Sequence, residues 1–250
     1  MRGLRRLIGL PWLSAIAPAL FILTAIAAAA RAEDAPPAAE PLQVAVFGDS
    51  QAQGIAGGLQ RVLLDDPRIH IINRTHPGAS LTHAESEWFG PVEHFVGHDK
   101  ADVAIVMFGA NDRLDMRDPK LGYLHFESDV WHDAYTAKVD RILAALQGAH
   151  LKIIWCGNPI ARSATYSSDM SYINGIFEAE VPKYGGTFFP LWSIITDAKG
   201  EFAAYGKDRS GTTERLRGDD GIHFTSAGYE VIADKLMPLL LPRLQTTAQK

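Results

Sequence analysis

The sequence lacks most features that would crosslink the chain or bind it to nucleic acid. Its 250 residues include a single cysteine, Cys156, which excludes an internal disulfide bond. The 24 basic residues against 29 acidic ones give a formal charge of −5, with no basic run beyond the first residues. Nucleic acid is therefore not an expected partner. With 47% hydrophobic residues, the chain has the composition of a folded domain that depends on burial for its stability.

Motifs for cofactors and metals are also missing. No glycine-rich phosphate loop and no dinucleotide fingerprint occur, so no cofactor is expected. Several histidines cluster between residues 70 and 98, and His94 lies four positions before His98. The His-Glu-x-x-His order of a zinc site is absent, however, and Pro91 and Gly97 argue against one long helix that carries the pair. We therefore expect a mixed polar surface here and no metal site.

The N-terminal segment has the pattern of an export signal. Three arginines among the first six residues precede an uncharged stretch over residues 7–30, and residues 30–32 have the small-x-small pattern that signal peptidase accepts. We predict a signal peptide over residues 1–32 and a periplasmic or secreted protein without stable membrane insertion. The alternative is an uncleaved membrane anchor, because the uncharged stretch is long enough to span a bilayer. Residues 33–41, with three prolines, predict a flexible spacer before a domain over residues 42–250.

Short apolar runs then alternate with segments in which apolar residues recur at helical spacing. The predicted strands are residues 44–47, 69–72, 103–108, 153–156 and 187–191. The predicted helices contain the apolar stripes at residues 55–63, 135–146, 172–177 and 229–240. Continuously apolar strands are typical of parallel sheets that helices cover on both faces. We predict an α/β fold, a three-layer α/β/α sandwich with a five-stranded, mainly parallel, flavodoxin-like sheet.

Two long segments, residues 112–129 and 193–219, show no periodicity. Long irregular segments in a compact domain are commonly functional loops. In an open α/β sheet the ligand crevice lies beyond the carboxyl ends of the strands. The residues that follow each predicted strand are therefore the first candidates for a functional site.

Three short polar motifs follow predicted strands, and a fourth stands just before the last predicted helix. They are Gly-Asp-Ser at residues 48–50, His-Pro-Gly-Ala at 76–79, Gly-Ala-Asn-Asp at 109–112 and Asp-Gly-Ile-His at 220–223. In the last motif, a carboxylate three residues before an imidazole can bind one ring nitrogen and leave the other free to act as a base. Each motif alone has an ordinary explanation, such as a turn with a helix cap. The occurrence of all four in this order is the stronger indication.

In these four motifs the chain resembles the SGNH (GDSL-type) hydrolases. The resemblance covers nearly all of residues 42–241. In the residues around the third and fourth motifs, the chain looks like a branch of exported bacterial SGNH proteins of unknown function. Two departures are visible. The usual leucine after the serine is Gln51, and the common Asn-x-Gly of the second block is replaced by His-Pro-Gly at residues 76–78.

The resemblance implies a serine nucleophile and names its partners. Ser50 would attack an ester carbonyl, His223 would take and return its proton, and Asp220 would orient the imidazole. The backbone N–H groups of Ser50 and Gly78 and the side-chain amide of Asn111 would form the oxyanion hole.

Four further residues are assigned from their positions. Asp49 is expected to support the site. Arg113 and Arg162 follow predicted strands closely and are candidates for binding an anionic substrate group, although salt bridges within the loops explain them equally well. Trp131 is a candidate for stacking on a sugar ring, and burial beneath the loops is the alternative. Cys156 lies in an apolar strand and is expected to be an inert thiol.

The implied function is that of an exported serine esterase. It would hydrolyse small acyl esters, with acetyl the expected group, and its expected partner is a small ester or an acylated carbohydrate of the cell envelope or of extracellular polysaccharide. Two alternatives stay open. One is an O-acyltransferase that uses the same triad to modify a polysaccharide. The other is a non-catalytic, polysaccharide-binding envelope protein on the same fold.

Overall fold

A computed structural model describes residues 40–247 of the chain, and of residues 241–247 it describes the backbone only. The predicted signal peptide and most of the predicted spacer lie outside the described residues. Within residues 40–247, no helix combines the length and the apolar character that crossing a bilayer requires.

The centre of the fold is a five-stranded sheet in the order β2-β1-β3-β6-β7. Its strands are β1 (Leu42–Gly48), β2 (Ile69–Thr75), β3 (Val103–Met107), β6 (Lys152–Cys156) and β7 (Thr187–Phe189). Every neighbouring pair is parallel. The sheet is therefore wholly parallel, and its strand order is that of the flavodoxin-like α/β folds. The predicted fold class is confirmed, and each strand lies within two or three residues of its predicted position.

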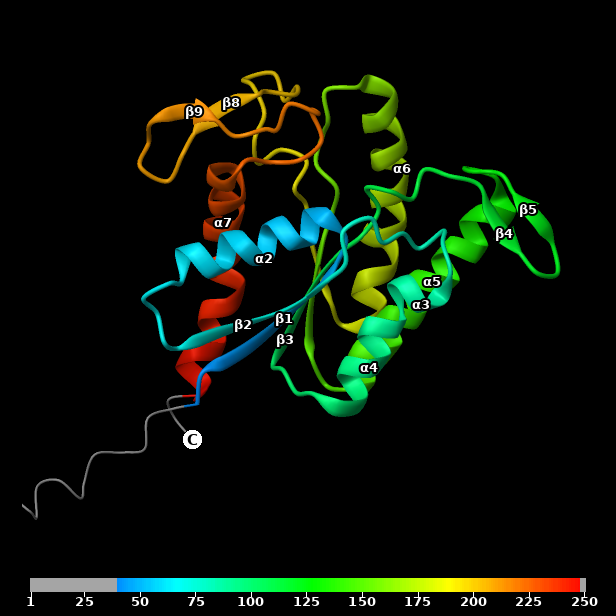
Figure 1. The fold of residues 1–250 in the computed structure, drawn as a ribbon, viewed down its shortest axis with the longest axis horizontal. Coiled ribbons are helices and arrows are strands. Elements are labelled where there is room, and N and C mark those ends of the chain that lie inside the picture. The colour runs from blue at the N-terminus through cyan, green and yellow to red at the C-terminus, as the bar shows by residue number, and fades with distance from the viewer. Residues whose placement is uncertain (1–39, 248–250) are drawn as a thin grey trace, which may run out of the picture. The chain divides into compact units, whose positions relative to one another are not determined.

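Helices cover both faces of the sheet, as Figure 1 shows. On one face lie α2 (Ser50–Val62) and α7 (Ser226–Thr247). On the other lie α4 (Gly90–His98), α5 (Asp129–Gly148) and α6 (Ala164–Glu180). A short helix α3 (Glu85–Trp88) precedes α4, and a 3₁₀ turn η1 (Val181–Tyr184) follows α6. The connections between parallel strands thus supply the outer two layers.

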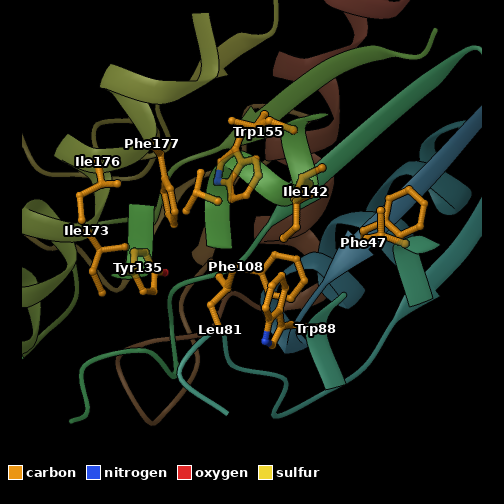
Figure 2. Packing of buried hydrophobic residues seen from close by; sticks show 14 of the residues in the cluster. Phe47, Leu81, Trp88, Phe108, Tyr135, Ile142, Trp155, Ile173, Ile176 and Phe177 are labelled. Carbon is orange, nitrogen blue, oxygen red and sulfur yellow. The ribbon is translucent and has the colours of Figure 1, made fainter. Parts of the chain in front are cut away.

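Alternating side chains of the strands build the two cores. In β1, Val44 and Val46 contribute to the core beneath α2 and α7, whereas Ala45 and Phe47 contribute to the opposite core. Figure 2 shows part of this second core, where aromatic and branched side chains from the sheet, α5 and α6 interdigitate. Because both faces are covered, the strands carry apolar side chains in both directions, which explains their continuously apolar sequences.

The two segments without periodicity each contain a small hairpin. Strands β4 (Met116–Asp118) and β5 (Gly122–Leu124) pair within the first, and β8 (Tyr205–Lys207) and β9 (Thr213–Arg215) pair within the second. Strands of three residues are too short to produce a recognisable period in the sequence. These segments are therefore partly ordered loops at the same end of the sheet as the polar motifs that follow β1 and β3.

Candidate active site

Ser50 stands at the carboxyl end of β1, where the chain turns directly into α2. Gly48 has a φ of +136°, and a Cβ at this position would lie 1.8 Å from the Met107 carbonyl oxygen of the neighbouring strand. Only glycine therefore permits this turn. Asp49 caps α2, because its Oδ1 accepts a hydrogen bond from the Gln51 N–H at 2.8 Å. The turn and the cap together place Ser50 in the first turn of the helix.

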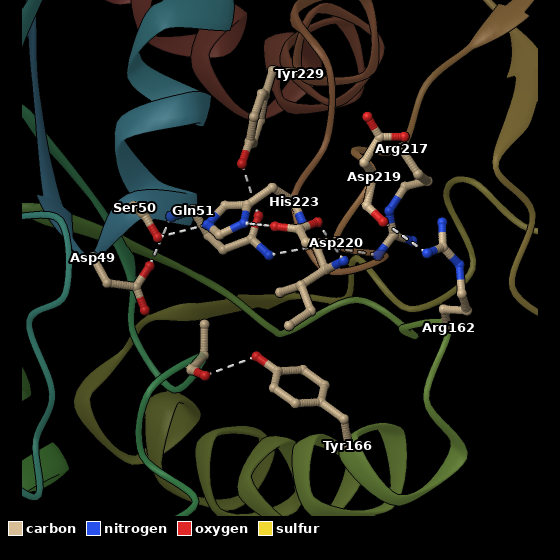
Figure 3. A network of polar contacts seen from close by, with 12 residues as sticks. Asp49, Ser50, Gln51, Arg162, Tyr166, Arg217, Asp219, Asp220, His223 and Tyr229 are labelled. Atoms are coloured by element: carbon tan, nitrogen blue, oxygen red, sulfur yellow. Dashed lines mark hydrogen bonds and ion pairs between the residues drawn. The ribbon is translucent and has the colours of Figure 1, made fainter.

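The structure brings Ser50, His223 and Asp220 into one chain of hydrogen bonds, shown in Figure 3. The Ser50 Oγ lies 2.7 Å from the His223 Nε2, and the His223 Nδ1 lies 2.6 Å from the Asp220 Oδ2. The other Asp220 oxygen, Oδ1, accepts the backbone N–H groups of Ile222 at 2.8 Å and of His223 at 3.0 Å. A carboxylate at Nδ1 keeps the proton on that nitrogen, which leaves Nε2 to accept the Ser50 hydroxyl proton.

The charge state of Asp220 suits this arrangement. Partial burial tends to raise its pKa, but hydrogen bonds from the His223 ring and from two backbone N–H groups outweigh burial, so the pKa of Asp220 is lowered. Its side chain remains 46% exposed. Asp220 is thus an ionised carboxylate at neutral pH, able to stabilise a positive charge on the imidazole.

Asp49, expected to support the site, has the opposite character. It has no exposed surface, and burial raises its pKa to about 7, with a further rise from the nearby carboxylate of Asp112 and partial compensation by the Gln51 N–H. Its Oδ2 has no hydrogen-bond partner among the described residues. The capping hydrogen bond shows how Asp49 supports Ser50, since it fixes the first turn of the helix that carries the hydroxyl.

Gly78 and Asn111 come from the turns that follow β2 and β3. Gly78 has a φ of +83°, and a Cβ added to it would have no atom within 4 Å, so glycine is needed here for its backbone conformation and not for lack of space. The Asn111 Nδ2 donates to the Ala79 carbonyl oxygen at 3.0 Å, which ties the two turns together. The His76 N–H donates to the Gly48 carbonyl oxygen at 2.8 Å, so the turn that contains Gly78 lies beside the turn that carries Ser50.

A buried network beneath these turns was not expected from the sequence. Asp112 has no exposed surface, and it accepts hydrogen bonds from the Leu81 N–H at 3.0 Å and from the Tyr135 hydroxyl at 2.6 Å. Burial raises the pKa of Asp112, although hydrogen bonds from Ser80 and Tyr135 oppose the rise. Asp112 therefore anchors the segment after Gly78 to α5.

Arg217 is a second buried residue whose role the sequence did not indicate. It is fully buried, and its guanidinium carbon lies 4.3 Å from the Phe224 ring centroid and 4.8 Å from that of Phe202. Burial lowers its pKa to about 10. The Arg217 Nη2 donates to the Ile222 carbonyl oxygen at 3.0 Å. Stacking on two rings and this hydrogen bond hold the loop that carries Asp220 and His223.

Three residues were candidates for substrate binding, and the prediction for Trp131 is wrong. It is fully buried, stacks on Tyr135 with ring centroids 4.5 Å apart, and donates its Nε1–H to the Leu114 carbonyl oxygen at 2.9 Å. Trp131 is one of the inward-facing residues of α5, so its ring belongs to the core and cannot meet a sugar.

The two arginine candidates are on the surface and already have partners. The Arg113 Nε lies 3.4 Å from the Asp169 Oδ2, and its side chain is 40% exposed. The Arg162 Nη1 donates to the Asp219 carbonyl oxygen at 2.7 Å. Neither contact is a salt bridge within a loop, because Asp169 belongs to α6 and Arg162 binds a backbone carbonyl. A role of either arginine in binding substrate stays a prediction.

Two further sequence predictions concern metals and Cys156. One helix, α4, does carry both His94 and His98, whose rings stack 4.5 Å apart; Pro91 is tolerated because it stands in the first turn. Within residues 40–247, no group of three or more His, Cys, Asp or Glu side chains is placed to hold a metal ion. Cys156 is buried in β6, and burial raises the pKa of its thiol, as an inert cysteine requires.

The fold is the one that the SGNH (GDSL-type) resemblance implies. Residues 43–239 match the model of the family DUF459, whose description is "Protein of unknown function". The chain belongs to this family. No curated protein matches the chain.

Solved structures with a similar fold include enzymes that act on acyl groups. A GDSL-like lipase from Bacteroides thetaiotaomicron is 13% identical, with a TM-score of 0.58 over 88% of this chain and 97% of that one. A catalytic mutant of Axe2, an acetylxylan esterase from Geobacillus stearothermophilus, is 15% identical, with a TM-score of 0.56 over 81% and 95%. The periplasmic domain of a lipopolysaccharide acetyltransferase from Salmonella ser. Paratyphi A is 14% identical, with a TM-score of 0.52 over 82% and 85%.

Proposed function

We propose that this protein is an exported serine esterase that hydrolyses small acyl esters, and that acetyl is the acyl group it removes. The observation that carries the proposal is the hydrogen-bonded chain from the Ser50 Oγ to the His223 Nε2 at 2.7 Å and from the His223 Nδ1 to Asp220 at 2.6 Å. A serine hydroxyl is a weak nucleophile by itself, and an adjacent imidazole oriented by a carboxylate is the arrangement that activates it.

The proposed reaction has two halves. The Ser50 Oγ forms a bond to the ester carbonyl carbon while its proton passes to the His223 Nε2, and the ionised Asp220 stabilises the resulting imidazolium. The tetrahedral intermediate collapses when His223 gives this proton to the departing alcohol, which leaves an acyl group on Ser50. Water, deprotonated by His223, then attacks the acyl carbon, and the proton returns to Ser50 as the carboxylic acid leaves.

The proposed oxyanion hole contains the backbone N–H groups of Ser50 and Gly78 and the side chain of Asn111. In the free protein one N–H of the Asn111 amide donates to Ala79. A side-chain amide has two N–H groups, so the second one is left for the oxyanion. The hydrogen bond to Ala79 would hold the amide in place before charge develops, which is the condition under which such donors are most effective.

The proposed substrate is an acylated carbohydrate of the cell envelope or of extracellular polysaccharide. Two observations support this class. The N-terminal sequence predicts export. The similar structures include an esterase of acetylated xylan and the periplasmic domain of a lipopolysaccharide acetyltransferase. The likeness to the acetyltransferase domain also supports acyl transfer to a sugar hydroxyl as an alternative function, because the same triad serves both reactions. Turnover that requires an acceptor sugar, with little hydrolysis, would favour transfer.

The test is reaction of the purified protein with a fluorophosphonate probe and with p-nitrophenyl acetate and acetylated glycans, followed by mass spectrometry of the intact protein. We expect a single adduct on Ser50, and a loss of roughly six decades in kcat for Ser50→Ala and for His223→Ala. Ser168→Ala, an exposed serine on α6, is the matched control and should keep the parent rate. A folded parent protein whose Ser50 does not react would support the non-catalytic alternative instead.

A further inference from the structure

The residue after the nucleophile is a buried glutamine. Gln51 is only 1% exposed, and it occupies the position at which the SGNH resemblance has leucine. A buried side-chain amide is unfavourable unless its oxygen and its nitrogen both find partners. The contacts of this amide therefore indicate why a polar residue is accommodated beneath the site.

Both ends of the Gln51 amide are bound. Its Nε2 donates to the Ile222 carbonyl oxygen at 3.0 Å, and its Oε1 accepts the Tyr229 hydroxyl proton at 2.8 Å. Since the Ile222 carbonyl only accepts hydrogen bonds, the amide nitrogen must face it. The Ile222 carbonyl thus fixes which way the amide points, and the Tyr229 hydroxyl donates to the oxygen on its other side; Figure 3 shows Tyr229 directed at Gln51.

Tyr229 reaches Gln51 because α2 has no side chain in the way. A Cβ at Gly54 would lie 1.9 Å from the Tyr229 ring, and a Cβ at Gly58 would lie 2.5 Å from the Tyr229 carbonyl oxygen. The two glycines are four residues apart and so share one face of α2. They allow α7 to approach closely and the Tyr229 ring to lie against the helix that carries Ser50.

The loop that carries His223 is otherwise held from other directions. Its ends pair with each other through the Gly218 N–H and the His223 carbonyl oxygen at 2.8 Å. Arg217 shares the Ile222 carbonyl, and the Arg162 N–H donates to the Gly221 carbonyl oxygen at 3.0 Å. Between α2 and residues 217–224, the hydrogen bonds described are those from Ser50 to His223 and from Gln51 to Ile222. The contact between Ser50 and His223 and the contact between Gln51 and Ile222 thus lie side by side and join α2 to residues 217–224.

We propose that Gln51 and Tyr229 are positioning residues that keep the His223 imidazole within hydrogen-bond reach of Ser50. The proposal rests on the esterase function proposed above. Without the Gln51 contact the loop keeps its internal bonds, including the one between Asp220 and His223, but it is free to shift relative to α2. The expected consequence is a less reactive Ser50, with the imidazole and its carboxylate still paired.

The test compares Gln51→Met, which keeps the length of the side chain, with Tyr229→Phe, which removes a single oxygen. Displacement of a reacting group by about 1 Å costs on the order of 100-fold in rate. We expect kcat to fall by about 10- to 100-fold in Gln51→Met and less in Tyr229→Phe, with KM nearly unchanged. The pH at which activity is half-maximal should stay at its parent value, because the contact between Asp220 and His223 is kept. The double variant should be no slower than Gln51→Met, since the Tyr229 hydroxyl acts through the amide.

The rate of fluorophosphonate labelling separates this proposal from the proposed function, because it reports the reactivity of Ser50 without an acyl substrate. Arg61→Met is the matched control: Arg61 joins α2 to α7 through Glu230 at 2.7 Å and through the Ser226 carbonyl oxygen at 3.1 Å, and no contact between Arg61 and residues 217–224 is described. Slower labelling of the folded Gln51 and Tyr229 variants, with Arg61→Met at the parent rate, would support the positioning role. Parent-like labelling of either folded variant would overturn it. A parent protein that is not labelled at all would overturn the proposed function and the positioning role with it.

Discussion

Three aspartates belong to the polar turns of the site, and their surroundings give them opposite electrostatics. Asp220 is partly exposed, in the part of the site that we call the rim, where hydrogen bonds from His223 and the backbone lower its pKa. Asp49 and Asp112 form what we call the floor of the site; neither has exposed surface, and burial raises the pKa of both. The same side chain is thus kept charged at the rim and is made costly to charge at the floor.

The difference indicates a division of labour. A carboxylate that stays ionised beside an imidazole can stabilise the positive charge that appears there during acyl transfer. The floor carboxylates accept N–H and O–H groups that shape the turns, at Gln51 for Asp49 and at Leu81 and Tyr135 for Asp112. Rim substitutions should therefore affect rate, whereas floor substitutions should affect stability and its pH dependence.

After the losses expected for Ser50→Ala and His223→Ala, the largest expected effect is that of the rim aspartate. Asp220→Asn keeps the size of the side chain but removes the charge and favours the wrong tautomer of His223, so kcat should fall by roughly four decades with little change in unfolding temperature. The measurement is steady-state hydrolysis of p-nitrophenyl acetate beside a thermal melt. Asp219→Asn is the control, because the neighbouring Asp219 pairs with Arg215 and its side chain is 90% exposed. Equal losses in the two variants would contradict the assignment of Asp220.

A smaller loss of rate is expected next to the floor. Asn111→Ala removes the amide proposed for the oxyanion hole, and loss of one such donor typically costs about two to three decades in kcat. It also removes the hydrogen bond to Ala79, so a thermal melt must accompany the kinetics. Asn73→Ala, at the exposed end of β2, should retain the parent rate. A parent-like kcat in Asn111→Ala would exclude that side chain from the oxyanion hole.

The floor should be visible in the pH dependence of stability. The pKa of Asp49 is raised to about 7 in the folded protein, so between about pH 4 and pH 7 the folded state holds a proton that the unfolded state has released. The free energy of unfolding should therefore fall as pH rises through this window, by up to about 1.4 kcal/mol per pH unit from this group. The raised pKa of Asp112 acts in the same direction.

Urea unfolding at several pH values between 5 and 8 measures this effect, and Asp49→Asn should flatten the curve. Stability that is constant or rises across the window would show that Asp49 ionises without difficulty and that the contrast does not hold.

Most of the fold could be predicted because burial leaves a strong pattern. Strands covered on both faces are continuously apolar, as residues 103–107 of β3 show, and the helices repeat apolar residues at their own period. Helix α4 could not be predicted in this way, since Pro91 and Gly97 resemble helix breakers although the first is harmless in a first turn. Helix α3 has four residues, which are too few to show a period. The three-residue strands in the long loops are too short to show a period in the sequence.

The site could be predicted only in part, for a physical reason. The carboxyl ends of parallel strands meet at one edge of the sheet, so residues such as Ser50 and Asn111 could be placed there from the order of strands alone. Which buried polar group meets which depends on tertiary packing. Tyr135 was visible as a member of an apolar stripe, which indicates its inward face, but nothing in a stripe reveals that its hydroxyl contacts Asp112. The prediction for Trp131 failed for another reason: α5 begins at Asp129, so its inward-facing stripe extends one turn before Tyr135 and includes Trp131.

The contact between Tyr135 and Asp112 gives the smallest expected effect. Tyr135→Phe keeps the ring in the core but removes the donor to the Asp112 carboxylate, which lies 2.6 Å away. Loss of a partner from a buried polar group costs about 1–3 kcal/mol, and more when that group is charged. We therefore expect a destabilisation by about 1–3 kcal/mol, with kcat reduced much less than in Asn111→Ala.

The control for this variant is Tyr172→Phe on α6, where the ring is partly exposed and no hydrogen bond from the hydroxyl is described. A surface change of this kind is usually within about 0.5 kcal/mol of the parent. Since both variants delete one hydroxyl from an aromatic ring, the difference between their unfolding curves isolates the buried contact. An equal effect in the two variants would show that the contact between the Tyr135 hydroxyl and Asp112 does not contribute to stability.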